Sequence, residues 1–289
     1  METFWGMPSL ASDHGGEVDR MLWLIHGLMF ALLIGWGVFY IVALARFRRA
    51  RHPKASYEGI RGRWAAWIEG VVVAVKAALL VGLAVPVWAT AVRALPGPEE
   101  DPVEVRVLAQ QFVWNVHYPG SDGVFGQTRP ELIDSGAGNP IGLDRGDPYA
   151  GDDIVKINWL HVPVGRPVVV HLTSLDVVHG FSLPEFRVKQ DAIPGMSVSV
   201  TFTPTKTTEQ FREELRAEAR AKLGDDPQAL AERLHAIEDR HFEIKCTQLC
   251  GMGHYNMRGF LKVHSEESYE AWLGEQADHA PEEVDEFWL

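Results

Sequence analysis

Cysteine is scarce in this chain: its 289 residues contain only Cys246 and Cys250. Two cysteines are too few for the multi-disulfide framework of a small secreted domain. The sequence also lacks a C-x-x-C-H motif, which excludes a covalently attached c-type haem. A cleaved signal peptide is not evident, because the first 20 residues are acidic and polar and the apolar run that follows is too long for one.

The two cysteines belong to a short stretch, residues 246–257, that also contains His254 and Met257. Thiolate, imidazole and thioether donors suit copper better than calcium or magnesium. Three other interpretations stay open. The four side chains would share one face of a helix, although Gly251 and Gly253 each cost about 1 kcal/mol of helix stability relative to alanine. A disulfide is the second alternative, and the third is a zinc site in which Met257 has no part.

Charged residues are absent from residues 21–45, an apolar run long enough to cross a hydrocarbon core of about 30 Å. A second run, residues 64–91, is of similar length but contains Glu69 and Lys76. These two side chains are two helical turns apart, so we expect them on one face of a helix, directed at protein or water rather than lipid. Pro86 is expected to kink this helix near its outer end.

Basic residues are concentrated between the two apolar runs, where Glu58 is the single acid. Short cytoplasmic loops carry an excess of basic residues, so we expect this turn inside and both chain ends outside. Trp64, Trp67 and Trp88 are at positions typical of interfacial anchors. The basic residues of the turn are Arg46, Arg48, Arg49, Arg51, Lys54, Arg61 and Arg63.

Net charge is unequally distributed along the chain. Residues 1–94 contain ten Lys and Arg and six Asp and Glu, a net charge of +4, and the whole chain has −12, so residues 95–289 have −12 − 4 = −16. An acidic external domain attracts basic partners and repels nucleic acid. The same charge would also serve solubility alone.

After the Pro-Gly-Pro break at residues 96–98, the pattern changes to short apolar runs separated by Pro and Gly. Many short strands of this kind indicate an antiparallel sandwich or barrel. Residues 176–181 are predicted to form a turn. The predicted strands are residues 103–108, 110–118, 154–160, 167–174, 196–202, 241–245 and 257–264.

Two segments interrupt the predicted strands. Residues 119–153 are rich in Gly, Asp and Pro and predict a long loop. Residues 206–240 predict a charged helical hairpin, in which Gly224 ends the first helix. Asp226 and Pro227 fit the N-cap and first-turn proline of the second helix.

These motifs together resemble one family. The chain looks like subunit II of the haem-copper cytochrome c oxidases. The features that carry the resemblance are two amino-terminal transmembrane segments, Asp-Val-Val-His at residues 176–179, Arg-Val-Lys-Gln-Asp-Ala-Ile-Pro-Gly at residues 187–195, and C-x3-C-x3-H-x2-M at residues 246–257. The similarity covers residues 21–264. It implies a membrane α plus all-β protein, with a two-helix transmembrane hairpin followed by a cupredoxin-like Greek-key β-sandwich or barrel that contains the inserted helical hairpin.

The resemblance implies a dinuclear copper centre in which two cysteine sulfurs bridge two ions. Two histidines would each bind one copper, with a thioether and a backbone carbonyl as weaker ligands. Bridging thiolates hold both redox states in nearly one geometry, and a weak thioether is a familiar tuning ligand. The implied ligands are His179, Cys246, Cys250, His254, Met257 and the carbonyl of Gln248. Six histidines match no ligand position and are expected to be ordinary residues: His117, His161, His171, His235, His241 and His264.

Three positions bear on the family's other functions. Gln248 stands where many relatives have a glutamate that reaches a magnesium ion, so the anionic ligand is missing and we assign no magnesium. Phe112 replaces the first tryptophan of the aromatic strand, so the resemblance implies electron entry at Phe112 or at the neighbouring Trp114. Glu69 lies where relatives have an acid at the mouth of a proton pathway into subunit I.

The resemblance implies the electron-transfer subunit of a terminal respiratory oxidase in a bacterial inner membrane. A separate cytochrome c would reduce the copper pair, and haem in subunit I would receive the electron for oxygen reduction. A quinol oxidase subunit is opposed by the retained copper ligands, and a membrane-anchored copper chaperone by the two spans. The expected parts are an external segment (1–20), a transmembrane hairpin (21–95), a copper domain (96–265) and an acidic C-terminal helix or tail (266–289).

Overall fold

The computed structural model describes residues 6–54, 57, 62–86, 88–89 and 95–277. It divides the chain into two units, one formed by Met1–Gly15 with Leu95–Leu289 and the other by Gly16–Ala94. Arg61 and Glu58 of the basic turn, residues 1–5 of the expected external segment and residues 278–289 of the expected tail lie outside the described residues.

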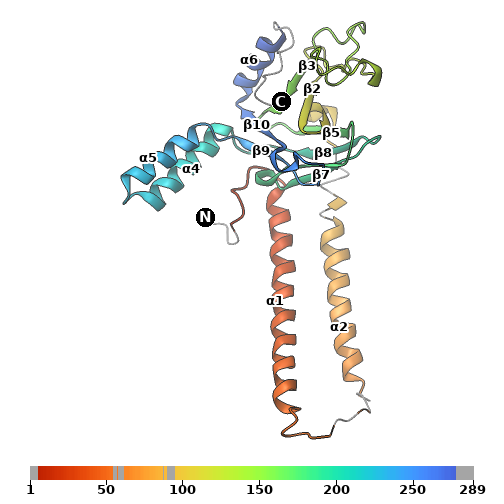
Figure 1. The fold of residues 1–289 in the computed structure, drawn as a ribbon, viewed down its shortest axis with the longest axis vertical. Helices are drawn as coiled ribbons and strands as arrows, with labels where there is room; N and C mark the ends of the chain where they lie inside the picture. The colour runs from red at the N-terminus through yellow and green to blue at the C-terminus, as the bar shows by residue number, and fades with distance from the viewer. Residues whose placement is uncertain (1–5, 55–56, 58–61, 87, 90–94, 278–289) are drawn as a thin grey trace. The chain divides into compact units, whose positions relative to one another are not determined.

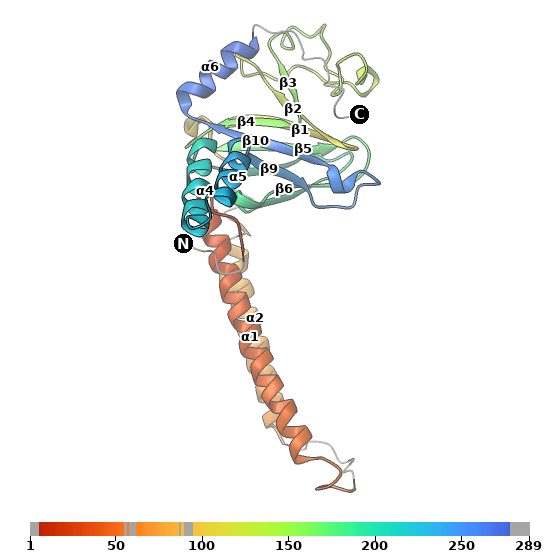
Figure 2. The ribbon, with the colours of Figure 1, turned by 60° about the vertical axis from the view of Figure 1, so that its left-hand side comes forward.

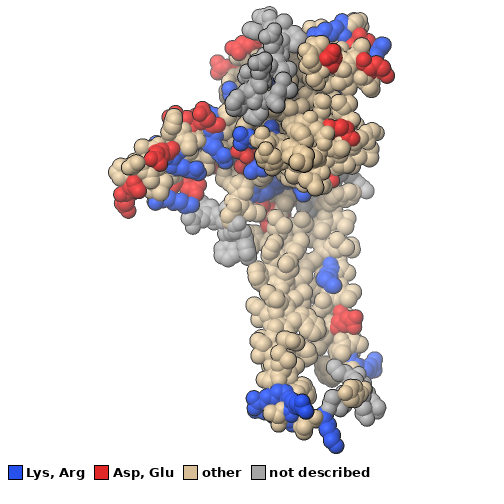
Figure 3. All heavy atoms as spheres, in the orientation of Figure 1, with Lys and Arg blue, Asp and Glu red and all other residues tan. Residues whose placement is uncertain are grey.

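The unit formed by Gly16–Ala94 consists of apolar helices. α1 (Gly15–Arg46) and α2 (Trp64–Leu79), which continues into the π-helical turn η1 (Leu80–Ala84), are both long and apolar enough to cross a membrane. Their apolar windows are entirely unburied, an arrangement that suits lipid because a helix satisfies its own backbone groups. Figure 3 shows Lys and Arg gathered at the end of this unit where α1 ends and α2 begins.

The described part of the other unit contains ten strands, which form a β domain (Figures 1 and 2). They are β1 (Val103–Gln110), β2 (Val113–Tyr118), β3 (Ile154–Ile157), β4 (Trp159–Pro163), β5 (Val168–Ser174), β6 (His179–Leu183), β7 (Val188–Ala192), β8 (Val198–Phe202), β9 (Phe242–Cys246) and β10 (Arg258–His264).

The strands make two five-stranded sheets, with the orders β3-β2-β1-β5-β8 and β4-β10-β9-β6-β7. Most neighbours are antiparallel, as expected. However, β1 pairs with β5, and β4 with β10, in parallel. Each sheet therefore contains both parallel and antiparallel pairs. The parallel partners are far apart in the sequence, so no local sequence pattern encodes their pairing.

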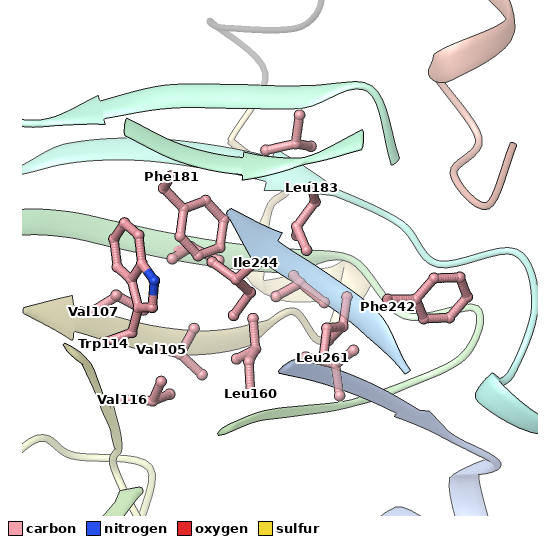
Figure 4. Packing of buried hydrophobic residues seen from close by; sticks show 14 of the residues in the cluster. Val105, Val107, Trp114, Val116, Leu160, Phe181, Leu183, Phe242, Ile244 and Leu261 are labelled. Carbon is pink, nitrogen blue, oxygen red and sulfur yellow. The ribbon is translucent and has the colours of Figure 1, made fainter. Parts of the chain in front are cut away.

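The core lies between the two sheets (Figure 4). Trp114 of β2 and Phe181 of β6 are fully buried and meet edge to face, with ring centroids 5.6 Å apart. Ile244 and Leu261, from β9 and β10, are also fully buried. Burying each such side chain contributes about 1.5–3 kcal/mol, so this core holds the sheets together.

Residues 154–160, predicted as one strand, form parts of two strands in different sheets. The break is at Asn158, whose φ of 61° is in the left-handed region that asparagine tolerates. Its side-chain oxygen accepts from the backbone N–H of Trp114 (2.9 Å), and its own N–H donates to the Trp114 carbonyl (2.7 Å). The chain passes from β3 to β4 here without losing its hydrogen bonds.

Residues 176–181 are not a simple turn, because His179 begins β6. All five residues of β6 are buried, so the strand shows no alternation of apolar and polar residues. β6 pairs with β7 on one side and β9 on the other. A strand covered on both faces and both edges has no period-two pattern, which explains why the sequence did not predict it.

The helical hairpin is confirmed as α4 (Thr208–Leu223) and α5 (Pro227–Glu238), which lie side by side in Figure 2. Asp226 is the N-cap of α5, and its carboxylate accepts from the N–H of Ala229 at 3.1 Å. After β10, residues Glu266–Ala277 form α6.

The long loop 119–153 is an ordered part of the β domain. Ile141, Leu143 and Ala150 form a small buried cluster of their own. At its end, Asp153 lies 2.6 Å from Nε2 of His117, and both side chains are buried. His117 therefore fastens the loop to β2, a structural role in keeping with its absence from the predicted ligands.

Three of the histidines expected to be ordinary are poor proton acceptors. Burial is the main cause, and it lowers the pKa of His161 to about 3 and those of His241 and His264 to about 4. His161 also stacks on Trp272 of α6, with ring centroids 4.3 Å apart, and its Nδ1 lies 2.8 Å from Nε2 of His264. These rings pack as neutral groups.

We expect acid to destabilise the β domain through these histidines. An unfolded histidine has a pKa near ~6.5, above the folded values, so the unfolded state binds protons first as pH falls. Stability should be full above about pH 6.5 and fall toward about pH 4. Chemical denaturation of the chain in detergent at several pH values measures this slope, which His161→Gln should reduce. His235→Gln is the matched control, because His235 is 85% exposed; equal slopes for the two variants would contradict the assignment.

Candidate metal centre

Strand pairing brings together site residues that are far apart in sequence. β6 carries His179 and lies beside β9, which ends at Cys246, with Phe181 opposite Cys246. The N–H of Thr247 donates to the carbonyl of Gly180 at 2.9 Å and continues the pairing past the strand end. A side-chain carbon at Gly180 would lie 2.4 Å from the Thr247 hydroxyl and 3.1 Å from the backbone nitrogen of Gln248, so glycine allows this approach without displacing them.

The stretch 246–257 is a loop between β9 and β10 and not a helix, which overturns the helix-stripe alternative. Gly251 has a φ of 137°, in the region that favours glycine. A short 3-10 turn, η5 (His254–Asn256), precedes the return into β10. Cys250 and Met257 are each only 3% exposed, so the loop directs these sulfurs inward.

The two thiols are unbonded and 3.8 Å apart, which overturns the disulfide alternative. Each thiol lies close to a histidine: His179 Nδ1 lies 3.9 Å from Cys246 Sγ, and His254 Nδ1 lies 3.6 Å from Cys250 Sγ. The structure thus places both cysteines and both histidines predicted as ligands in one cluster.

The two weaker donors complete the cluster. Met257 Sδ lies 3.2 Å from His179 Nδ1 and 3.7 Å from Cys250 Sγ. The carbonyl oxygen of Gln248 lies 3.3 Å from Cys246 Sγ. All six donors predicted from the resemblance are therefore within contact distance of another member of the set.

This donor set fits a soft or borderline metal. Ligand bonds of about 2.0–2.3 Å to nitrogen and sulfur place donors of one ion roughly 3–4 Å apart, the range seen here. Nitrogen and sulfur atoms of His179, Cys246 and Cys250 all lie within 4.8 Å of one another. Two thiolates with imidazole and thioether favour copper, and the closeness of the Met257 sulfur counts against zinc.

Asp176, which the sequence did not single out as a site residue, orients His179. Its Oδ1 accepts from Nε2 of His179 at 2.8 Å, so the other ring nitrogen, Nδ1, faces the sulfurs. The same carboxylate accepts from the backbone N–H groups of Gln111 (2.7 Å) and Val177 (2.6 Å). A carboxylate behind a ligand histidine raises its basicity and fixes its ring. The sequence signal for this role was the position of Asp176 three residues before His179.

The two thiols differ in acidity. Burial opposes ionisation of Cys246, but the hydrogen bond from His179 stabilises the thiolate and lowers the pKa of Cys246. Burial and the neighbouring Cys246 both raise the pKa of Cys250. Burial also opposes protonation of His179, yet Cys246 and Asp176 raise its pKa. The pair therefore gives up one proton readily and holds the other tightly, and a bound cation between the sulfurs would favour ionisation of both.

Phe112 and Trp114 both border the cluster. Phe112 is half-buried and packs over the loop glycines, since a side-chain carbon at Gly253 would meet its ring at 2.6 Å. Trp114 is fully buried, with its ring centroid 6.2 Å from that of His179. Of these two candidates for electron entry, Phe112 reaches the surface. Glu69 belongs to the helical unit, and its implied role in proton entry stays a prediction.

The fold and the site define a membrane-anchored β-sandwich with a group of donors that could hold a soft metal. Residues 148–213 match the family model of the cytochrome c oxidase subunit II periplasmic domain. The chain is 31% identical to the alternative cytochrome c oxidase subunit 2 of Bradyrhizobium diazoefficiens over 280 residues, which is 96% of this chain and 86% of that protein. It is 31% identical to cytochrome c oxidase subunit 2 of Cereibacter sphaeroides over 192 residues, 62% of this chain and 50% of that protein.

Among solved structures, the periplasmic domain of subunit II of cytochrome oxidase (CoxB) of Bradyrhizobium japonicum is 23% identical and covers 60% of this chain and 92% of its own, with a TM-score of 0.36. A TM-score this low carries no argument about fold, so membership rests on the sequence matches. The chain belongs to the cytochrome c oxidase subunit II family. It is a subunit of a haem-copper oxidase, an enzyme complex, and the family binds copper.

We expect Asp176→Asn to weaken copper binding about 10–100-fold, the usual effect of removing an outer-shell partner. The amide loses the negative charge that makes His179 a better ligand. Competition of the full-length chain in detergent with a copper chelator measures the affinity. Asp225→Asn, at the exposed turn between α4 and α5, is the matched control. Equal affinities in the two variants would mean that Asp176 has no such role.

Proposed function

We propose that this chain is the electron-transfer subunit of a terminal oxidase and that its six donors hold two copper ions in one dinuclear centre. The observation that carries the proposal is the pair of free thiols 3.8 Å apart, each close to a histidine. Bound copper would supply one-electron uptake and release. The two-span anchor and the family membership favour a subunit over a copper chaperone.

The protein's own residues keep the donor geometry constant. His179 is fully buried in β6 and held by Asp176, and Met257 is buried immediately before β10. Cys246 is the last residue of β9, and Cys250 lies on the loop that joins β9 to β10. His179, Cys250 and Met257 are buried, and donors held in this way move little, which keeps the reorganisation that accompanies electron transfer small.

The proposed electron donor is a separate cytochrome c. This chain has no C-x-x-C-H motif, and the −16 charge of residues 95–289 favours a basic partner. Phe112, half-buried over the copper loop, is the proposed entry point. The acceptor is haem in subunit I, where oxygen is reduced, and other oxidase subunits complete the assembly. Glu69 is proposed at the mouth of a proton pathway, and no magnesium is assigned.

The proposed location is a bacterial inner membrane. The family model that matches residues 148–213 is that of a periplasmic domain. The basic turn between α1 and α2 favours the inner side by the positive-inside rule. Both chain ends and the copper domain would then be on the periplasmic side.

The copper centre is tested on the full-length chain in detergent by metal analysis and electron paramagnetic resonance. We expect two coppers per chain that share one unpaired electron. Cys250→Ser should abolish the shared-electron signal, because one sulfur cannot hold the pair together. Met252→Leu, at a loop position 93% exposed, should retain it. A mononuclear signal or zinc in the unaltered chain would overturn the proposal.

The charge of the β domain predicts salt-dependent electron transfer. The rate of copper reduction by a basic cytochrome c should fall as salt rises, because the Debye length is only about 10 Å at 0.1 M. Stopped-flow reduction of the copper-loaded chain measures this rate. An uncharged small-molecule reductant is the control and should show no such fall. A rate with cytochrome c that is indifferent to salt would contradict electrostatic steering.

A further inference from the structure

The side chain of Gln248 makes a contact that is not needed for its carbonyl to be a ligand. Its amide nitrogen Nε2 donates to both carboxylate oxygens of Asp191, at 3.2 and 3.0 Å. Asp191 lies on β7, directly opposite Gly180 of β6 in the sheet register. Gly180 is the residue next to the ligand His179, so this contact lies immediately beside the metal centre.

Gln248 crosses the backbone of β6 to reach Asp191. A side-chain carbon at Gly180 would lie 3.1 Å from the backbone nitrogen of Gln248 and 3.2 Å from its Cγ, so Gln248 packs directly over this glycine. The preceding residue is held too, since the N–H of Thr247 donates to the Gly180 carbonyl. The carbonyl of Gln248 meanwhile faces Cys246 Sγ at 3.3 Å. Gln248 is thus held through its side-chain amide and its backbone, while its backbone carbonyl faces the cysteine sulfur.

The contact depends on a hydrogen-bond donor at position 248. An amide N–H that donates to a carboxylate forms a charge-assisted hydrogen bond, stronger and shorter than a neutral one. A carboxylate at position 248 has no hydrogen to donate and would place like charges about 3 Å apart, where they repel. In this chain the residue at position 248 must therefore carry a hydrogen-bond donor to hold the loop on Asp191, and the glutamine amide supplies it.

We propose that the Gln248–Asp191 hydrogen bond is a positioning device that holds the Gln248 carbonyl on the copper centre. The copper part of this inference rests on the proposed function. Gln248 is then a residue with two roles, a ligand through its backbone and an anchor through its side chain. Asp191 acts on the metal only through Gln248.

The experiment reverses the hydrogen bond in the full-length, copper-loaded chain in detergent. Gln248→Glu introduces repulsion and should lower copper affinity at least about tenfold, as for other outer-shell changes. It should also change the copper hyperfine pattern. Adding Asp191→Asn to that variant turns the acceptor into a donor, and should restore both affinity and spectrum. Asp191→Ala, which removes the acceptor without repulsion, should give a smaller loss.

Gln210→Glu is the matched control for the added charge. Gln210 is the third residue of the α4 capping box, where its Oε1 accepts from the N–H of Thr207 at 2.8 Å. Glutamate and glutamine serve equally there, so this variant should match the unaltered chain in affinity and spectrum.

Restoration of the spectrum by the double variant, with an unchanged control, supports the proposal. Unchanged affinity and spectrum in Gln248→Glu would overturn it, as would a double variant no better than Gln248→Glu. If the unaltered chain binds no copper pair, the proposed function fails separately. The hydrogen bond is then judged on the copper-free chain, where Gln248→Glu should lower the Tm and the double variant should recover it; failure to recover overturns the anchor itself.

Discussion

The site depends on the pairing of β6 with β9. The proposed donors are divided between His179 on β6 and the stretch 246–257, which follows from the end of β9. Bringing them together closes a long chain segment, and the entropic cost of that closure is met by burial of the sandwich core. Gly180 allows the two backbones to approach closely enough for Thr247 to extend the pairing beyond the strand. The position of the proposed donors therefore depends on the packing of the sandwich core.

Hydrogen bonds from residues outside the donor set hold the donors in place. Asp176 holds the ring of His179 and also accepts from the backbone beside Phe112, which links a ligand to the aromatic residue over the loop. On the other side, Gln248 is held by Asp191. These carboxylates lie outside the donor set and act by hydrogen bonding, so they constrain geometry without adding ligands.

The charge distribution divides the chain by environment. The helical unit is apolar along its length and basic at its turn, which suits insertion with that turn inside. The β domain carries the negative charge, and most of its ion pairs are exposed, as on α4, where Arg216 bonds Glu209 and Glu213. Exposed pairs of this kind add little stability. The excess of acidic side chains therefore lies on the surface, where a partner can meet it. The stability comes from the core.

The sequence by itself determined the two apolar helices, the sandwich class and the helical hairpin, because length, periodicity and capping residues are local properties. The six proposed donors were predicted from the resemblance of motifs to a known family. It did not predict β6, since a strand buried on all sides has no alternation, nor the passage between sheets at Asn158, which depends on hydrogen bonds to Trp114 and Phe260. Asp191 was visible only as part of a motif. Only the tertiary structure joined it to Gln248 and placed Asp176 behind His179, because such contacts follow from which strands become neighbours and no spacing along the chain encodes them.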